Sequence, residues 1–539
     1  MRHLERHFQS YLATSLACLR LTPSMPPIPI IDLFAGPGGL GEGFSSLPSL
    51  TGGRRFRIAL SIEKDPKAHQ TLALRAFFRQ FPLGDVPEEY YQFVRAPLQS
   101  GQMVGAYPKE ARAAEREAWL HEMSPESASV VTERIGNVLG NTDQWVLIGG
   151  PPCQAYSLAG RSRNSGVEGY DPAKDRRQTL YLEYLQIIAD HGPPVFVMEN
   201  VKGLLSATLG KRSMFARIIE DLRQPADAIR AAGRSVRRGA APHRYRVVSL
   251  APFGSLLDDE PRDFVVQAED HGVPQARHRV ILLGIRDDIS RAPSRLTVQS
   301  NRTSVATAIG NLPKVRSGLS DREDSAENWR STLAFATPSG WLKRMKTRGD
   351  RETAQVILET IEELRLPPKD RGDEFLDSTA SPRFANAFLG DERLEGVLNH
   401  STRSHIHSDL HRYLFAASFA KVHGRSPQLA DFPVLLRPKH SNVAEALKGE
   451  MFADRFRVQL AGKPSTTITS HISKDGHYYI HYDPSQCRSL TVREAARLQT
   501  FPDNYFFCGG RTAQYSQVGN AVPPLLARQI AEIVSALLS

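Results

Sequence analysis

The 539-residue sequence predicts an α/β fold with a doubly wound, mostly parallel sheet, followed by a second, irregular region. Short apolar runs that end in glycine or in an acidic residue alternate with amphipathic stretches, a pattern typical of parallel strands joined by helical crossovers. The first run, residues 28–34, leads into a glycine-rich turn over residues 35–41. From about residue 287 to residue 487 this alternation stops, and the sequence becomes polar and rich in Arg, His, Ser and Pro.

The composition indicates a large globular protein with a polyanionic partner. A chain of this length exceeds one ordinary hydrophobic core, so two domains or more are expected. The formal net charge of +10 favours nucleic acid as the partner. No apolar run is long enough to span a bilayer, and the four cysteines lie too far apart for a zinc ribbon or a disulfide framework. We therefore expect a cytoplasmic protein without a membrane segment.

A glycine turn and an acid at the end of the next strand form the plan of a nucleotide-binding crossover. The glycines let the backbone approach a ligand closely, and the second apolar run, residues 56–62, ends in Glu63. A carboxylate in this place can accept hydrogen bonds from both hydroxyls of a ribose. A helix is expected from Lys67 to about Phe81, and residues 86–143 are expected to form a helical insertion.

One cysteine stands on a stiff loop directly after a buried strand. The apolar run 145–148 breaks into a Gly-Gly-Pro-Pro sequence, and Cys153 follows. A thiol fixed in this way can act as a nucleophile, although most free cysteines are small buried hydrophobes. The next apolar run, residues 195–198, ends in Glu199. Because neighbouring parallel strands end at a common edge, we expect the thiol and the carboxyl group to face one cleft.

Two arginines extend this pattern. Alternation along residues 275–279 places Gln275, Arg277 and Arg279 on one face of an extended segment. The two guanidinium groups need either an anionic or carbonyl-rich ligand or, more simply, the salt bridges of a surface strand. His407 and His411 have the i, i+4 spacing of a metal pair, but no nearby acid or cysteine completes a ligand set, so no metal is expected.

Six stretches, in the same order along the chain, resemble the motifs of the DNA (cytosine-5) methyltransferases of bacterial restriction–modification and phage-defence systems. They are residues 32–39, 150–154, 199–201, 275–279, 488–503 and 519–524. Residues 154–157 depart from the family, which more often has Gly-Phe-Ser there. The resemblance implies a class I, Rossmann-like methyltransferase fold, S-adenosylmethionine as cofactor and double-stranded DNA as substrate.

The resemblance also implies a domain organisation. Residues 1–27 would be an N-terminal extension, 28–286 the cofactor-binding catalytic domain, 287–487 a target recognition domain, and 488–539 a segment that returns to the catalytic domain. A cognate nuclease or other defence-system subunits would be partners. Candidate DNA contacts in the recognition domain are Arg403, Arg412, Arg437, Lys439, His440 and Arg455.

Carried over motif by motif, the resemblance implies the site residues. Those expected to bind the cofactor are Phe34, Gly36, Gly38, Gly39, Glu63, Pro151, Leu180, Asn520 and Val522. The family usually has another acid near the adenine, for which Asp85 is the candidate.

The chemistry assigns the remaining residues. A thiolate from Cys153 would add to carbon 6 of a cytosine swung out of the duplex, while Glu199 holds the ring nitrogen N3 and the exocyclic amine. Arg279 would bind the O2 carbonyl, and Arg277 would fix the loop or contact a flanking phosphate. The activated carbon 5 then takes the methyl group from the cofactor.

Three other functions remain open at this point. Some relatives with this core methylate transfer RNA, although they tend to have a shorter variable region. A DNA-binding protein without catalysis would not need the set of thiol, acid and arginine. A nicotinamide-dependent oxidoreductase is suggested only by the glycine turn.

Overall fold

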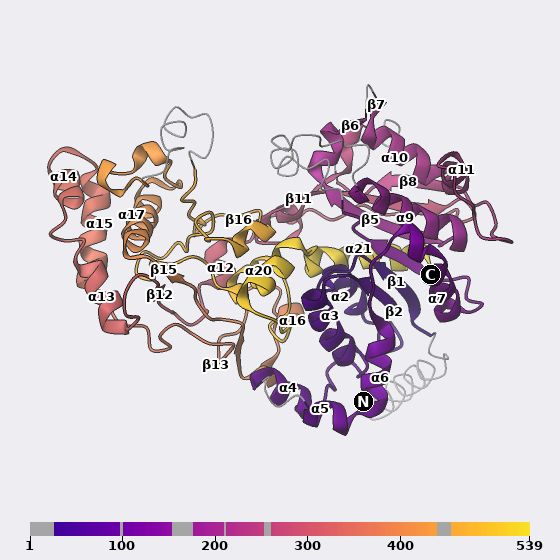
Figure 1. The fold of residues 1–539 in the computed structure, drawn as a ribbon, viewed down its shortest axis with the longest axis horizontal. Helices are drawn as coiled ribbons and strands as arrows, with labels where there is room; N and C mark the ends of the chain where they lie inside the picture. The colour runs from indigo at the N-terminus through magenta and orange to yellow at the C-terminus, as the bar shows by residue number, and fades with distance from the viewer. Residues whose placement is uncertain (1–25, 97–100, 153–175, 210–211, 253–259, 439–453) are drawn as a thin grey trace, which may run out of the picture.

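The computed structural model describes residues 26–96, 101–152, 176–209, 212–252, 260–438 and 454–539. An α/β lobe and a mostly helical lobe lie side by side, and the C-terminal segment runs between them (Figure 1). The α/β lobe contains one large sheet with strand order β3-β2-β1-β4-β5-β11-β8, and β9 pairs with β11. Strands β1 to β5 are parallel, whereas β11 is antiparallel to its neighbours. The predicted doubly wound, mostly parallel α/β fold is confirmed.

The strands of this sheet are near-continuous apolar runs, as expected for a sheet that is covered on both faces. Their bounds are β1 Ile28–Leu33, β2 Phe56–Glu63, β3 Ala118–Leu120, β4 Val146–Gly149, β5 Val195–Val201, β8 Tyr245–Ser249, β9 Val265–Gln267 and β11 His278–Arg286.

The expectation that residues 86–143 form only helices was incomplete. Helices α4 (Glu88–Arg95), α5 (Gly101–Ala106), α6 (Pro108–Glu117) and α7 (Ala128–Leu139) are present. Between α6 and α7, however, β3 pairs in parallel with β2 and extends the sheet. A strand of three residues is too short to show alternation in the sequence, which is why the pattern predicted helices alone.

Two helical layers cover the large sheet. On one face, α2 (Gly39–Ser45) packs with α21 (Pro524–Leu537), so helices from near both ends of the chain form one layer. On the other face lie α7, α9 (Arg176–His191), α10 (Met214–Arg223) and α11 (Pro225–Ala231). Helix α3 (Pro66–Arg79) packs against α6 in a separate cluster.

The second lobe has a core of its own. Trp329, Leu342, Ile357, Leu414 and Phe432 are buried together in this core. They come from α13 (Ala326–Ala334), α14 (Gly340–Arg348), α15 (Arg351–Glu362), α17 (His407–His423) and the chain that follows α17. Helix α12 (Val305–Ile309) instead packs with α19 (Val492–Leu498) and α20 (Arg511–Asn520), which carry the chain back to the α/β lobe.

The remaining strands of the described residues form short pairs, and one further α-helix is present beside short 3-10 helices. The pairs are β6 (Thr208–Leu209) with β7 (Arg212–Ser213), β10 (Gln275–Ala276) with β16 (Ser465–Thr466), β12 (Gly318–Leu319) with β15 (Ser404–His405), and β13 (Phe375–Asp377) with β14 (Gly396–Leu398), and the helix is α16 (Asn386–Leu389).

A buried ion pair joins the helices beneath the glycine turn. Arg75 of α3 donates to Glu42 of α2 at 2.5 and 2.8 Å and to Asn504 at 2.9 Å. Burial alone would lower the pKa of Arg75, but the Glu42 carboxylate raises it above its usual value. Tyr505, whose ring lies under Arg75, donates its hydroxyl to the carbonyl of Pro37. The C-terminal segment is thereby tied to the glycine turn.

Replacing Glu42 with Gln should lower the free energy of unfolding by about 3–5 kcal/mol, because the Arg75 cation would stay buried without its counter-charge. Chemical denaturation followed by tryptophan fluorescence measures this change. The matched control is Glu122→Gln, which removes the exposed 3.2 Å pair with Lys64 and should cost less than about 1 kcal/mol. Equal losses in the two variants would contradict the stabilising role of the Arg75–Glu42 pair.

Candidate active site

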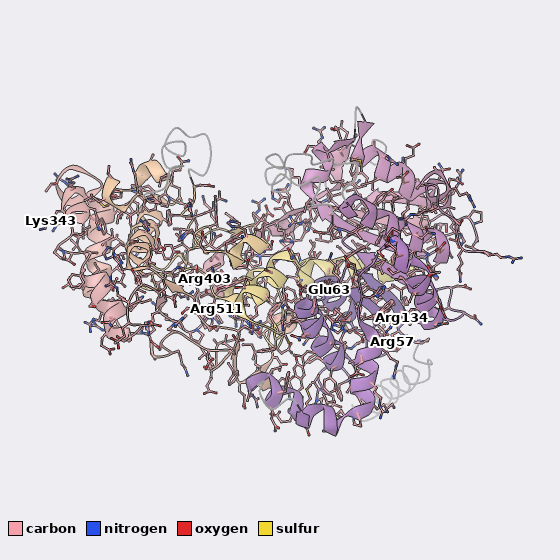
Figure 2. All side chains as sticks on the ribbon, in the orientation of Figure 1. Arg57, Glu63, Arg134, Lys343, Arg403 and Arg511 are labelled. Atoms are coloured by element: carbon pink, nitrogen blue, oxygen red, sulfur yellow. The ribbon has the colours of Figure 1, made fainter. Side chains whose placement is uncertain are left out.

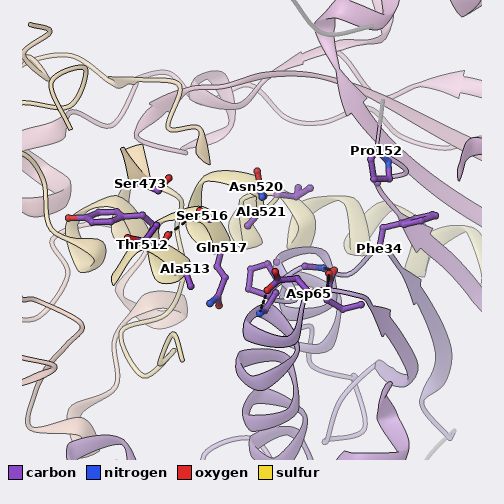
Figure 3. Close-up of a pocket in the computed structure, with 18 of the residues that line it drawn as sticks. Phe34, Asp65, Pro152, Ser473, Thr512, Ala513, Ser516, Gln517, Asn520 and Ala521 are labelled. Carbon is purple, nitrogen blue, oxygen red and sulfur yellow. Dashed lines mark hydrogen bonds between the residues drawn. The ribbon is translucent and has the colours of Figure 1, made fainter. Parts of the chain in front are cut away.

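The carboxyl ends of β1, β2, β4 and β5 meet at one edge of the sheet, where a cavity of about 1130 Å³ opens. Phe34 follows β1, Glu63 ends β2, Pro151 and Pro152 follow β4, and Glu199 lies near the end of β5; all of them line the cavity. Figure 3 shows Phe34 and Pro152 at one side of the cavity and α20 along it. The loop that leads toward Cys153 and the Glu199 side chain therefore share one edge, as expected for neighbouring parallel strands.

The glycine turn presents backbone to this cavity. Phe34 has a φ of 58°, a left-handed conformation that is rare for a bulky residue, and this turns the chain sharply out of β1. Gly36 also has a positive φ, and a Cβ placed there would meet nothing within 4 Å. At Gly39 a Cβ would lie 2.3 Å from the Val522 carbonyl oxygen, so only glycine lets the C-terminal segment approach α2.

Glu63 is fixed by two backbone N–H groups. Its Oε2 accepts from Gly36 at 2.7 Å, and its Oε1 accepts from Asp65 at 2.7 Å. The carboxylate thus stands beside the glycine turn with further lone pairs available to a ligand. The Asp32 side chain lies deeper, and its two carboxyl oxygens have no hydrogen-bond partner among the described residues. Burial raises the pKa of Asp32 to about 8, and Arg79 only partly offsets this effect.

Glu199 and Arg279 form an ion pair across two antiparallel strands. The Arg279 Nε lies 2.9 Å from the Glu199 Oε1, and each side chain is only 14% exposed. The register of β5 and β11, which pairs Glu199 with Ile281 and Val201 with Arg279, places the two residues side by side. A Cβ at Gly150 would lie 3.2 Å from the Glu199 Oε2, so the loop after β4 passes directly over the carboxylate.

The same loop is held by the residue after Glu199. Asn200 donates its side-chain amide to the carbonyl of Pro151 at 3.3 Å. Cys153, the predicted nucleophile, comes one residue after Pro152 and lies outside the described residues, as do Lys439 and His440.

Arg277 has a structural role: its side chain joins the segment before β11 to the chain around Ile468 and Gly519. It is almost completely buried and donates to the carbonyls of Ile468 at 2.9 Å and Gly519 at 3.3 Å. Burial, reinforced by nearby Arg279, holds the pKa of Arg277 well below its usual value. Of the two roles expected for Arg277, this position fits fixing the loop, whereas a residue buried in this way is not exposed to a DNA phosphate.

Most of the residues expected to bind the cofactor come together. The cavity is lined by Phe34, Gly36, Gly39, Glu63, Pro151, Leu180, Asn520 and Val522. Gly38 does not line the cavity. Its backbone packs against Leu72 and Tyr505, and a Cβ at this position would lie 2.9 and 3.1 Å from them. Gly38 instead supplies the left-handed N-cap of α2.

Asp85 is exposed and does not line the cavity. The third strand ends at Leu120, and it is His121 and Met123 just after it that reach the cavity. The His121 ring stacks on Trp119 at 4.0 Å, and the backbone N–H of His121 donates to the Glu63 carbonyl at 2.9 Å. The sequence pattern did not indicate these two residues because it did not reveal β3, which is only three residues long.

The two histidines with metal-like spacing have other partners. His407 pairs with Asp321, and His411 bonds the Thr332 carbonyl at 2.8 Å. Within the part of the chain that the structure describes, no three His, Cys, Asp or Glu residues gather to hold a metal ion. In the same ranges, no helix combines the length and the apolar character that crossing a membrane requires.

Comparison with known proteins gives one consistent result. The model of the C-5 cytosine-specific DNA methylase family matches residues 129–225 and 263–536, more than half of the chain. Type II methyltransferase M.Bpa9945I of Bacillus paralicheniformis is 32% identical over 524 residues, which cover 94% of this chain and 98% of that protein. M.AgeI of Thalassovita gelatinovora is 27% identical over 532 residues, 94% of this chain and 99% of that protein.

A third relative is described by its activity. DNA (cytosine-5-)-methyltransferase M.ApeKI of Aeropyrum pernix is 25% identical over 535 residues, which cover 94% of this chain and 98% of that protein. These relatives match almost the whole chain, the second lobe included. The chain belongs to the C-5 cytosine-specific DNA methylase family and is a DNA (cytosine-5-)-methyltransferase.

Proposed function

We propose that this enzyme takes its methyl group from S-adenosylmethionine and transfers it to a cytosine extruded from duplex DNA, with Cys153 as nucleophile. The observation that carries the proposal is the Glu199–Arg279 pair at 2.9 Å under the loop that leads to Cys153. The same cavity reaches Glu63 and the open backbone of the glycine turn. The Glu199–Arg279 pair and the elements expected to bind the nucleotide part of the cofactor thus lie at the same cavity.

The residues present fit S-adenosylmethionine. Glu63 would hold the ribose hydroxyls, the backbone at Phe34 and Gly36 would lie along the ligand, and Asn520 and Val522 would close the C-terminal side. Asp65 also lines the cavity beside Glu63, and an acid in this place suits a ligand with positive groups. When bound, this cofactor supplies an electrophilic methyl group, so the reaction needs no metal.

The chain's own residues activate the cytosine. The Cys153 thiolate adds to carbon 6 of the ring, which makes carbon 5 nucleophilic. Glu199 holds a proton at N3 and accepts from the exocyclic amine, so that charge is drawn from the ring as sulfur attacks. Arg279 keeps the Glu199 carboxylate in place and donates to the O2 carbonyl. After methylation, loss of the C5 proton expels the thiolate and restores the aromatic ring.

The target base is out of reach while it stays stacked, and swinging it out costs a few kcal/mol. Contacts to the DNA must offset this cost, and we assign them to residues 287–487 as a target recognition domain. Two of the named relatives, M.Bpa9945I and M.AgeI, are type II methyltransferases. On this basis we propose a role in restriction–modification with a cognate nuclease as the genetic partner.

Replacing Cys153 with Ala should abolish methyl transfer, whereas Glu199→Gln should slow it by about 10²–10⁴, the usual contribution of a positioned acid. Incorporation of labelled methyl groups into unmethylated plasmid DNA measures both rates. Cys508→Ala is the matched control, because this thiol is hydrogen-bonded to Thr71 and does not line the cavity, so the rate should stay unchanged. Transfer by the Cys153→Ala enzyme at a rate near that of the wild type would defeat the mechanism.

Replacing Glu63 with Ala should weaken binding of S-adenosylmethionine by roughly 10–100-fold, since hydrogen bonds to a charged group contribute about 1.5–3 kcal/mol. Isothermal titration calorimetry without DNA measures this affinity. Glu122→Gln, on an exposed side chain just beyond β3, serves as the control and should bind the cofactor normally. Wild-type affinity in the Glu63→Ala variant would remove Glu63 from the cofactor site.

A further inference from the structure

The cavity continues past the proposed cofactor site into the second lobe. Figure 3 shows Ser473 and Thr512 at the end opposite Phe34 and Pro152. We call this end the distal pocket and define it by six of the residues that line it: Arg403, Ser404, Ser473, Lys474, Arg511 and Thr512. None of the residues expected to bind the cofactor lies in this set, so its ligand has to be accounted for separately.

Three cations of the distal pocket have no carboxylate partner within 4.0 Å among the described residues: Arg403, Lys474 and Arg511. Arg403 donates to the carbonyls of Lys474 and Ile472 at 2.7 Å each. Arg511 donates to the carbonyl of Thr402. These main-chain bonds hold the guanidinium groups in place without neutralising them. Burial is the main cause that lowers the pKa of Arg511; Arg371 and Arg403 add to this effect, and Tyr515 and Glu374 partly offset it.

The acids at this end of the cavity are already paired. Asp409 binds Arg412 at 2.6 Å, and Asp475 lies 3.7 Å from Arg455 and 3.8 Å from His477. The charges of Arg403, Lys474 and Arg511 are therefore not balanced from within the described part of the cavity. Figure 2 shows Arg403 and Arg511 close together between the lobes, with Glu63 on the α/β side.

The first turn of α20 adds hydrogen-bond donors to the same place. Its N-cap is Gly510, which has no side chain to cap the helix. Gly510, Thr512 and Ala513 line the cavity, so the N-terminal end of the helix faces it. Backbone N–H groups at a helix N-terminus favour anions, and here they reinforce the fixed side-chain cations. Hydroxyl groups from Ser473 and Thr512 complete a donor set suited to phosphate oxygens.

We propose that the distal pocket binds a backbone phosphate of the DNA close to the extruded cytosine. This inference rests on the proposed function, and it ranks the candidate DNA contacts. Arg403 lines the pocket, whereas Arg412 and Arg437 do not, and Arg412 is also paired with Asp409. Because the pocket and Glu199 line one cavity, we assign to the pocket a phosphate from the same stretch of DNA as the target base.

The test uses Lys474→Gln, Arg511→Gln and the double variant of the full-length enzyme. The KM for unmethylated plasmid DNA should rise roughly tenfold in the double variant, with kcat changed less. The slope of log KM against log salt should become shallower by about 0.9 for each phosphate that the variant no longer neutralises. The calorimetric affinity for S-adenosylmethionine should stay at the wild-type value.

Two matched variants separate charge from structure. Arg511→Lys keeps the cation and should retain most of the salt dependence. Arg57→Gln removes an exposed cation on β2, which Figure 2 places far from the pocket, and should leave both KM and slope unchanged. Lys474→Gln keeps the test valid if Arg511→Gln fails to fold, because the Lys474 side chain makes no hydrogen bond to the described residues.

Unchanged KM and salt slope in the folded variants would overturn the inference, as would a fall in cofactor affinity with normal DNA kinetics. Failure of the proposed function has a different signature: the wild-type enzyme itself would not transfer methyl groups to DNA. An active wild-type enzyme with unaffected variants would therefore refute the phosphate pocket alone.

Discussion

The ion pair between Glu199 and Arg279 is the interaction on which the site depends. It joins neighbouring antiparallel strands at the point where the parallel part of the sheet ends. The carboxylate is largely shielded from solvent, and the guanidinium group fixes its orientation. The guanidinium group can still donate to a substrate carbonyl. The loop after β4 passes over this pair so closely that a Cβ at position 150 would lie 3.2 Å from the Glu199 carboxylate. One local arrangement thus holds the acid, the arginine and the start of the loop that leads to Cys153.

The return of the C-terminal segment explains why the motifs are so far apart in sequence. Arg277 is buried against the carbonyls of Ile468 and Gly519, and Tyr505 donates to the carbonyl of Pro37. Helix α21 covers the face of the sheet next to α2. Residues that follow the second lobe are therefore as much a part of the cavity wall as the glycine turn. The phosphate pocket that we propose lies where this returning segment meets the second lobe.

The sequence predicted the parallel sheet and the placement of Glu63 and Glu199, because strand ends are marked by apolar runs that stop at a polar residue. It also predicted the family, which the comparisons confirm. It missed His121, since a strand of three residues leaves no periodic signal. The packing of Gly38 against Leu72 depends on a side chain distant in sequence. The raised pKa of Asp32 likewise depends on its burial and on the distant Arg79. The meeting of Arg403 with Arg511 likewise depends on tertiary packing, which no local pattern encodes.

The central claim is that sulfur from Cys153 bonds to carbon 6 of an extruded cytosine. Duplex DNA whose cytosines carry fluorine at carbon 5 tests it directly, because fluorine cannot leave as the C5 proton does and the covalent adduct should persist after methyl transfer. Peptide mass spectrometry of the digested complex reads the attachment site. We expect one adduct, on Cys153, that requires S-adenosylmethionine to persist. An adduct on Cys487 or Cys508, or methylation of normal DNA without any trapped complex, would contradict the claim.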